Sequence, residues 1–225
     1  MTKQEVLGRI ADVGLVPVVR ARSADEAILV ADAIRAGGVS VLEITMTVPG
    51  ALSVIEEVAR RFGSEVVVGA GTVLDATTAR ACILAGARFI VGPTTDRETI
   101  ALCRRYGVAV MPGALTPTEV LTAWTAGADV VKVFPCGSVG GASYIKSLKA
   151  PLPQIQMIPT GGVSLKNAGD FIKAGAMALG VGADLADTQA IRDGKAALVT
   201  ERAREYLRIV REARESEEAA RSEHG

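Results

Sequence analysis

The chain has 225 residues, of which 49% are hydrophobic and only 4% aromatic. This length suits one α/β barrel of roughly 200–250 residues, and apolar mass made of Val, Leu, Ile and Ala is typical of parallel strands covered by helices. Lys and Arg together number 25, as do Asp and Glu, and no basic stripe with interleaved aromatic residues occurs. This balance argues against a nucleic acid partner.

The cysteine content and the first residues of the chain indicate in which cellular compartment the protein is expected. Cys82, Cys103 and Cys136 are odd in number and widely spaced, which argues against a disulfide framework or a metal site and fits reduced thiols. The residues after Met1 are polar, and no apolar window of about 18 residues occurs. We therefore expect a cytoplasmic protein that does not enter a membrane.

The one histidine is His224, the second-last residue. A Ser-His-Asp triad, a Cys-His pair and a histidine-ligated zinc site each need a histidine that the rest of the chain lacks. Catalysis by this chain therefore requires carboxylates, a lysine, backbone groups or a cofactor.

Short β-rich runs recur along the chain, and amphipathic helical stretches lie between them. A helix is expected first, over residues 2–13. The eight runs expected to form strands cover residues 15–21, 39–46, 65–72, 88–94, 108–115, 130–135, 156–162 and 177–185. Helices are expected between them, for example over residues 25–36, 49–62, 76–85 and 118–126. Helix is also expected over residues 188–214, and a frayed helix or disordered tail over residues 215–225.

Similar capping residues recur at the ends of the expected helices. Ser23 is a good N-cap, and Ala-Gly pairs close several helices, as at Ala36-Gly37 and Ala85-Gly86. Eight repeated βα units predict an α/β fold, a (β/α)8 TIM barrel, with an open eight-stranded sheet as the alternative. We expect a single domain over residues 1–225, with the barrel core over about 15–185 and a C-terminal helical extension over 186–225.

Lys132 lies among valines in the sixth expected strand. Residues of a barrel strand alternate between the interior and the surrounding helices. We therefore expect Val131 and Val133 to face the helices and Lys132 to face the interior. Burial favours the neutral amine, which is the nucleophilic form. A structural lysine paired with a carboxylate is the alternative.

Glu43 lies between Leu42 and Ile44 in the second expected strand. A structural ion pair with Lys132 is one interpretation, and a general acid/base beside a Schiff-base lysine is the other. Two buried ionisable residues of opposite sign inside one barrel are better explained by one functional site than by two unrelated structural roles.

Other candidates lie where strands end, because barrel active sites form at the carboxyl ends of the strands. Thr72 follows Gly69-Ala70-Gly71 and offers a hydroxyl and an amide. Glycine-rich turns at Thr160-Gly161-Gly162 and Gly180-Val181-Gly182 lie where barrels commonly bind phosphate through backbone N–H groups. Arg20 ends the first strand and is a candidate for binding a substrate carboxylate.

Five motifs taken together resemble one family, the 2-keto-3-deoxy-6-phosphogluconate (KDPG) aldolases, which include 4-hydroxy-2-oxoglutarate aldolases and a galactonate-derived counterpart. The motifs are Glu43-Ile44-Thr45, Gly69-Ala70-Gly71-Thr72-Val73, Met111-Pro112-Gly113, Lys132-Val133-Phe134-Pro135 and Pro159-Thr160-Gly161-Gly162-Val163. They occur in the family's order and span nearly the whole barrel.

The resemblance implies a homotrimeric class I aldolase that needs no metal or cofactor. Lys132 would form an imine with a small keto acid, and Glu43 would act as acid/base. The resemblance also gives roles to other residues: Thr72 would bind the pyruvate carboxylate, Pro93 and Phe134 would wall the pyruvate pocket, and Gly161 and Gly162 would donate backbone N–H groups to a substrate phosphate.

The sequence departs from the family pattern at two positions. Thr47 stands where many members carry arginine; it is itself expected to bind substrate, and Arg20 is expected to supply the missing charge. Ala183 follows Gly182 where many members have a serine that contacts phosphate. The expected reaction is cleavage of KDPG to pyruvate and glyceraldehyde 3-phosphate, and 4-hydroxy-2-oxoglutarate or the galactonate-derived substrate are alternatives.

Two other classes of protein stay open on the residues alone. A phosphate-binding barrel isomerase or synthase would use the same glycine turns, with Asp184 as its spare acid/base candidate. A catalytically silent scaffold barrel is the non-enzymatic alternative. The set of Glu43, Thr72 and Lys132 favours the aldolase.

Overall fold

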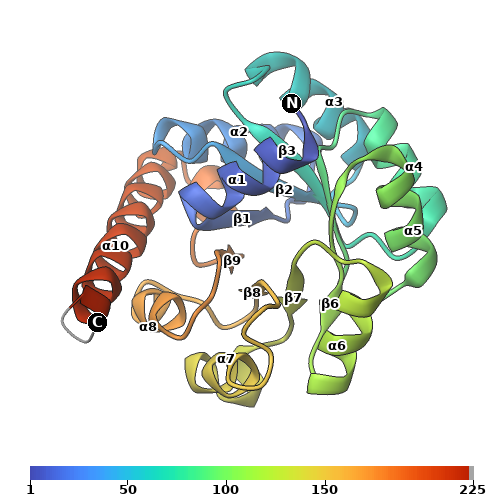
Figure 1. Cartoon of the computed structure of the whole chain (residues 1–225). Coiled ribbons are helices and arrows are strands. Elements are labelled where there is room, and N and C mark those ends of the chain that lie inside the picture. The colour runs from blue at the N-terminus through green and yellow to red at the C-terminus, as the bar shows by residue number, and fades with distance from the viewer. Residues whose placement is uncertain (223–225) are drawn as a thin grey trace.

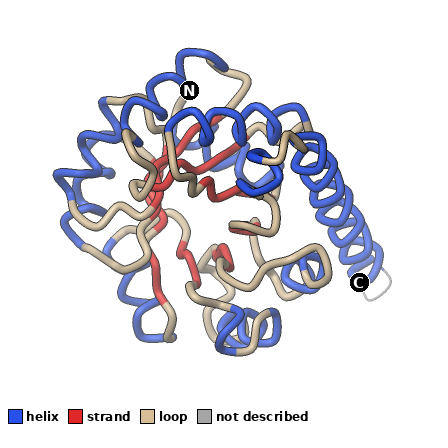
Figure 2. Tube along the Cα trace, turned by 180° about the vertical axis from the view of Figure 1, so that it is seen from behind, coloured by secondary structure: helices blue, strands red, loops and turns tan. Residues whose placement is uncertain are grey.

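The computed structural model describes residues 1–222 of the chain, and helices surround a ring of short parallel strands (Figure 1, Figure 2). In chain order the elements are α1 (Lys3–Val13), β1 (Leu15–Val19), α2 (Ala24–Ala36), β2 (Val41–Thr45), α3 (Ala51–Phe62), β3 (Val67–Gly71), α4 (Ala76–Leu84), β4 (Phe89–Val91), α5 (Arg97–Tyr106), β5 (Ala109–Met111), β6 (Gly113–Ala114), α6 (Pro117–Ala126), β7 (Val131–Val133), η1 (Gly137–Val139), α7 (Ala142–Lys149), β8 (Met157–Pro159), α8 (Ala168–Lys173), β9 (Leu179–Val181), α9 (Thr188–Arg192) and α10 (Ala196–Ser222).

The strands pair in the order of a closed parallel barrel. One sheet runs β5-β4-β3-β2-β1-β9 and another β6-β7-β8. Pro112 alone separates β5 from β6. It interrupts the strand because proline has no N–H to donate to the ladder, although its carbonyl still accepts from the Lys132 N–H at 2.9 Å. A parallel bridge between Thr160 and Gly180 joins β8 to β9. The barrel prediction is confirmed, and the open-sheet alternative is wrong.

Two apolar layers fill the barrel. The larger layer lies between strands and helices and includes Val131 and Val133, as the alternation along the strand predicts. The inner layer holds residues such as Val41 and Val67, and Val6 and Ile10 of α1 pack against it. Because α1 covers the end of the barrel where the strands begin, the carboxyl ends of the strands form the open end.

The strands are shorter than the β-rich runs of the sequence. The run over residues 177–185 contributes only Leu179–Val181 to β9. Beyond it, the N–H groups of Leu185 and Ala186 return to the Gly182 carbonyl at 3.0 and 2.9 Å. The run therefore ends in a turn that lies at the open end of the barrel.

Local signals set most helix ends. The Ser23 side chain accepts from the Glu26 N–H as N-cap of α2, and Gly37 is its C-cap. The helix expected from residue 49 begins instead at Ala51, after Gly50 in a left-handed conformation. All three cysteines are buried and free.

The last helix, α10, is longer than expected. Its buried residues repeat every three or four positions, the period of one helix face, and are Val199, Ala203, Tyr206, Val210 and Ala213. This face packs on α2, α8 and α9. The helix continues to Ser222, so the tail is helical that far, while His224 lies outside the described residues. Within residues 1–222 no helix is long and apolar enough to cross a membrane.

Candidate active site

A cavity of about 470 Å³ opens at the carboxyl ends of the strands. All but two of the residues expected in the site line it: Arg20, Thr72, Pro93, Lys132, Phe134, Thr160, Gly161, Gly162 and Gly182. Beneath it, a smaller space is lined by Glu43, Lys132 and Thr160. Lys132 and Thr160 line both spaces, so the carboxyl of Glu43 lies below the floor of the main cavity.

Lys132 projects into the barrel from the middle of β7. Its residue is only 7% exposed, and its Nζ lies 5.3 Å from the centroid of the Phe134 ring. That distance allows a cation–π contact when the amine is protonated. Among the described residues no ion pair joins Lys132 to a carboxylate. The lysine is therefore buried without the partner that a structural role would need.

Glu43 projects inward from β2 and is 2% exposed. Its Oε1 is buried without a hydrogen-bond partner. Burial raises the pKa of the Glu43 carboxyl above its usual range, and the charges of Lys132 and Arg20 counteract this shift only in part. A carboxyl of this kind can exchange protons with a group that enters the cavity.

Gly71, at the end of β3, gives Glu43 its space. A Cβ at this position would overlap the Glu43 carboxyl. The small residue is thus a packing requirement of the site. The sequence shows a glycine here, but only the structure, in which β2 lies beside β3, brings the Glu43 side chain against Gly71.

Thr72 follows β3 with φ 56°, a left-handed backbone that β-branched residues rarely adopt. The next residue, Val73, is held by a hydrogen bond from its N–H to the Val91 carbonyl at 3.1 Å. Strained residues of this kind concentrate at functional sites. The left-handed residue thus lies at the cavity wall, between β3 and the bond that Val73 makes to β4.

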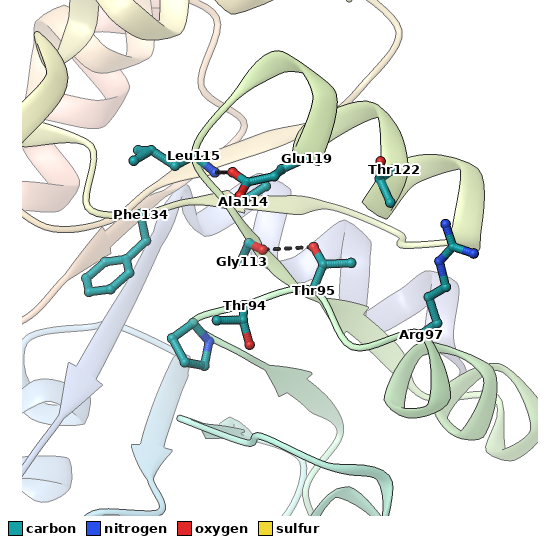
Figure 3. A pocket seen from close by; sticks show the side chains of 10 residues that line it. Thr94, Thr95, Arg97, Gly113, Ala114, Leu115, Glu119, Thr122 and Phe134 are labelled. Carbon is teal, nitrogen blue, oxygen red and sulfur yellow. Dashed lines mark hydrogen bonds between the residues drawn. The ribbon is translucent and has the colours of Figure 1, made fainter.

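Phe134 and Pro93 separate the main cavity from a second one of about 380 Å³. Figure 3 shows this second cavity, with Phe134 on one side and Arg97 on the other. The Thr95 hydroxyl donates to the Gly113 carbonyl at 2.8 Å and closes the second cavity between the β4 and β6 ends. No pattern in the sequence indicated this second cavity, because its walls come from separate strand ends.

The glycine turn after β8 has the shape expected of a ligand cradle. Gly161 and Gly162 have φ 83° and 81°, which favours glycine. A Cβ on Gly162 would lie 2.8 Å from the Gly137 Cα, so the two backbones need glycine to approach. In the neighbouring turn after β9, a Cβ at Gly182 would meet nothing within 4 Å. Both turns thus leave backbone accessible from the cavity.

Of Thr47 and Arg20, only Arg20 lines the main cavity. Arg20 is exposed and lines the main cavity. Thr47 is exposed and lines neither of the two spaces that hold Lys132. Its hydroxyl instead lies 2.7 Å from that of Thr45, which donates to the Val19 carbonyl at 3.2 Å. The structure therefore does not bring Thr47 to the cavity.

Asp184 also lines the main cavity. Its Oδ2 accepts a hydrogen bond from the Tyr206 hydroxyl at 2.5 Å. Tyr206 is a functional candidate that reasoning from the sequence missed, since its only signal was a place on the apolar face of a helix. Within residues 1–222 no three His, Cys, Asp or Glu side chains are grouped to hold a metal ion.

The fold and this cavity place the chain among the (β/α)8-barrel enzymes. A sequence profile described as KDPG and KHG aldolase matches residues 6–202. The chain belongs to the KDPG and KHG aldolase family, and it is an aldolase, a carbon–carbon lyase. The expected resemblance is confirmed, and it decides against the isomerase and the silent barrel.

Three known proteins illustrate the relationship. The 2-dehydro-3-deoxy-6-phosphogalactonate aldolase of Escherichia coli is 37% identical over 172 residues, 76% of this chain and 83% of that protein. The 2-dehydro-3-deoxy-phosphogluconate aldolase of Treponema pallidum is 31% identical over 198 residues, 88% of this chain and 94% of that protein. The KDPG aldolase of Legionella pneumophila, solved with pyruvate as a covalent carbinolamine, has a TM-score of 0.82 and 28% identity, covering 88% of this chain and 96% of that chain.

Proposed function

We propose that this aldolase cleaves a 2-keto-3-deoxy-4-hydroxy acid through an imine on Lys132, with Glu43 as the acid/base. One observation carries the proposal. Lys132 and Glu43 are buried, form no ion pair with each other, and line the same inner space. The Legionella relative, which holds pyruvate covalently, supports the same chemistry.

Imine formation begins when the neutral amine of Lys132 attacks the C2 ketone. Proton transfer gives a carbinolamine, and Glu43 supplies the proton with which the hydroxyl leaves as water. The product is a protonated imine, which accepts electrons. Help from a general acid/base in such steps is worth roughly 10²–10⁴-fold.

Carbon–carbon cleavage follows from the imine. The Glu43 carboxylate takes the proton of the C4 hydroxyl, the C3–C4 bond breaks, and its electron pair moves toward the imine nitrogen. An aldehyde leaves, and an enamine of pyruvate stays on Lys132. Glu43 returns the proton to C3, and water hydrolyses the imine to release pyruvate and the free amine.

The remaining cavity residues divide between the two halves of the substrate. Thr72 and Arg20 bind the carboxylate of the pyruvate half, and Pro93 and Phe134 wall it. Thr160 lies near the reacting carbons, since it lines the inner space with Lys132. Gly161, Gly162 and Gly182 face the remote end, where accessible backbone supports binding of a phosphate. Thr47 has no part in this arrangement, since it does not line the cavity.

The proposed substrate is KDPG, cleaved to pyruvate and glyceraldehyde 3-phosphate. The named relatives from Treponema and Legionella support it. The Escherichia coli relative favours the galactonate-derived substrate as the second candidate, and 4-hydroxy-2-oxoglutarate is the third. A comparison of kcat/KM for retro-aldol cleavage of all three decides among them, and we expect KDPG to give the highest value.

Trapping tests the imine itself. Incubation with pyruvate and borohydride should reduce the imine and add a stable pyruvate-derived mass to the peptide that contains Lys132. Active enzyme that gives no such adduct would contradict the proposed mechanism.

We also propose that the protein acts as a homotrimer in the cytoplasm. Large apolar side chains lie exposed on three successive outer helices: Leu84 on α4, Tyr106 on α5, and Leu121 and Trp124 on α6. Neighbouring helices of this series pack together. Exposed large apolar side chains on neighbouring outer helices support contact with further copies of the chain.

A further inference from the structure

The helix α10 reaches the active-site cavity from behind the cavity wall. It extends beyond residue 202, where the match to the family ends. Tyr206 of α10 is fully buried, at 0% exposure. Its hydroxyl donates to Asp184 Oδ2 at 2.5 Å, and the Leu165 N–H approaches the same oxygen at a longer 3.4 Å. The tyrosine therefore provides the shorter of the two bonds that fix this carboxylate.

A second residue of α10 fixes the backbone of the same turn. Arg202 donates to the Asp184 carbonyl at 3.1 Å and to the Asp187 carboxylate at 3.0 Å. Asp187 in turn accepts from the Ala190 N–H at 3.0 Å and caps α9. The turn over residues 182–187 is thus held from α10 at its main chain and at its side chains. Figure 1 shows α10 beside α8 and α2, on whose outer side it packs.

The held turn forms the outer part of the cavity wall. Ala183 and Asp184 are exposed, whereas Lys132 is 7% exposed at the bottom. Lys132, Ala183 and Asp184 line the same cavity, so the aldehyde half of a substrate bound with C2 at Lys132 can reach the turn. Ala183 has no polar side chain to offer. Asp184 Oδ1 makes no hydrogen bond among the described residues, so it can accept one from a ligand.

We propose that Asp184 accepts a hydrogen bond from a hydroxyl of the aldehyde half and that Tyr206 is the positioning residue for it. This inference rests on the proposed aldol cleavage. The bond from Tyr206 to Oδ2 fixes the orientation of the Asp184 carboxylate. Oδ1 can then accept the substrate hydroxyl while the Asp184 side chain loses little rotational freedom on binding. The helix beyond the family match thereby takes part in selecting the aldehyde.

Kinetics in the direction of condensation test the proposal, because pyruvate and the aldehyde then have separate KM values. Tyr206→Phe removes one hydroxyl and keeps the ring. We expect the KM for glyceraldehyde to rise about tenfold, the usual effect of weakening one hydrogen bond to a charged group. The KM for pyruvate and the yield of the pyruvate–borohydride adduct should not change. Propionaldehyde, which has the same carbon chain without hydroxyls, should show an unchanged KM.

A matched control lies on the same helix. The Thr200 hydroxyl donates to the Ala33 carbonyl at 2.9 Å and holds α10 against α2, away from the cavity. Thr200→Val removes one hydrogen bond of α10 and should leave the KM for glyceraldehyde unchanged. A rise equal to that of Tyr206→Phe would show that any loosening of α10 has this effect and would overturn the proposal.

Asp184→Ala tests the contact directly and does not depend on the folding of the tyrosine variant. Its KM for glyceraldehyde should rise at least as much, and adding Tyr206→Phe should have no further effect. Additive effects, an equal rise in the KM for pyruvate, or no rise in either single variant would overturn the proposal. Absence of the pyruvate adduct in the unchanged protein would instead overturn the proposed function, and this inference with it.

Discussion

Lys132 and Glu43 each cost stability in a barrel interior, because a buried charge without a partner loses its hydration. Both are retained, and neither is neutralised in an ion pair with the other. Two costly residues that line one space are therefore best explained by chemistry. Each can be tested by a substitution that preserves its shape.

Lys132→Met keeps the apolar stem and removes the amine. Retro-aldol activity should fall by about 10⁴-fold or more, as expected when a covalent nucleophile is lost, and the pyruvate–borohydride adduct should disappear. Steady-state rates and peptide mass spectrometry measure both. Lys173→Met, at an exposed position of α8, is the matched control and should keep the rate and the adduct. Near-normal activity in Lys132→Met would contradict the proposed role.

Glu43→Gln keeps the size of the side chain and removes its proton exchange. We expect kcat to fall by roughly 10²–10⁴-fold. The variant should also show how ionisation of Glu43 affects stability. Because burial raises the pKa of this carboxyl in the folded protein, the folded state binds more protons than the unfolded state above the usual value of 4.5, and stability falls as pH rises through that window.

The Glu43→Gln variant has no carboxyl at this position, so it does not lose this stability as the pH rises. Its melting temperature relative to the unchanged protein should therefore increase as pH is raised from about 5 to 8, as calorimetry can measure. Glu56→Gln, at an exposed site on α3, should give a difference that does not vary with pH. A difference that is equally flat for Glu43→Gln would show that burial does not raise this pKa.

At the scale of elements, strand pairing decides which residues meet. Alternation along β7 was enough to predict that Val131 and Val133 face the helices and Lys132 the interior. The ends of the runs were less predictable. Residues after β9 leave the ladder and form part of the cavity wall, and their β-rich composition conceals this.

Gly71→Ala tests the pairing of β2 with β3. The added Cβ would overlap the Glu43 carboxyl, and Glu43 must move away from its proton-transfer position. We expect kcat to fall by about 10²-fold, the usual effect of a small misplacement of a catalytic group. Kinetics with KDPG measure it.

The control for this variant is Gly8→Ala on α1, where a Cβ would meet nothing within 4 Å. Replacing a helical glycine there should raise the free energy of unfolding by about 0.5–1 kcal/mol and leave kcat unchanged. If Gly71→Ala keeps full activity, Glu43 has more room than the structure shows.

At the scale of the whole molecule, we propose that the described residues 1–222 form one domain and that copies associate through the face formed by α4–α6, where large apolar side chains are exposed. Leu121→Glu with Trp124→Glu places charges on that face. Sedimentation should show a trimer for the unchanged protein and smaller species for the variant, because charges are costly in an apolar interface. A matched pair at Leu29 and Leu198, exposed on α2 and α10, should stay trimeric. A trimer that survives the α6 changes must use another face.

The sequence by itself determined the barrel, the inward direction of Lys132 and Glu43, and the family. These features follow from short-range patterns: the period of a strand, the caps of a helix, and motifs at strand ends. Only the tertiary structure decided that Thr47 lies outside the cavity and that Gly71 makes room for Glu43.

The tertiary structure also decided that Tyr206 reaches Asp184 and that Pro93 and Phe134 divide two cavities. These outcomes depend on how segments far apart in the chain meet. Tyr206 lies on a helix that packs from outside the barrel, and no local pattern records which loop it will touch. The physical reason is that a strand's alternation is fixed by its own backbone, whereas contacts between loops and outer helices are fixed by the packing of the complete barrel.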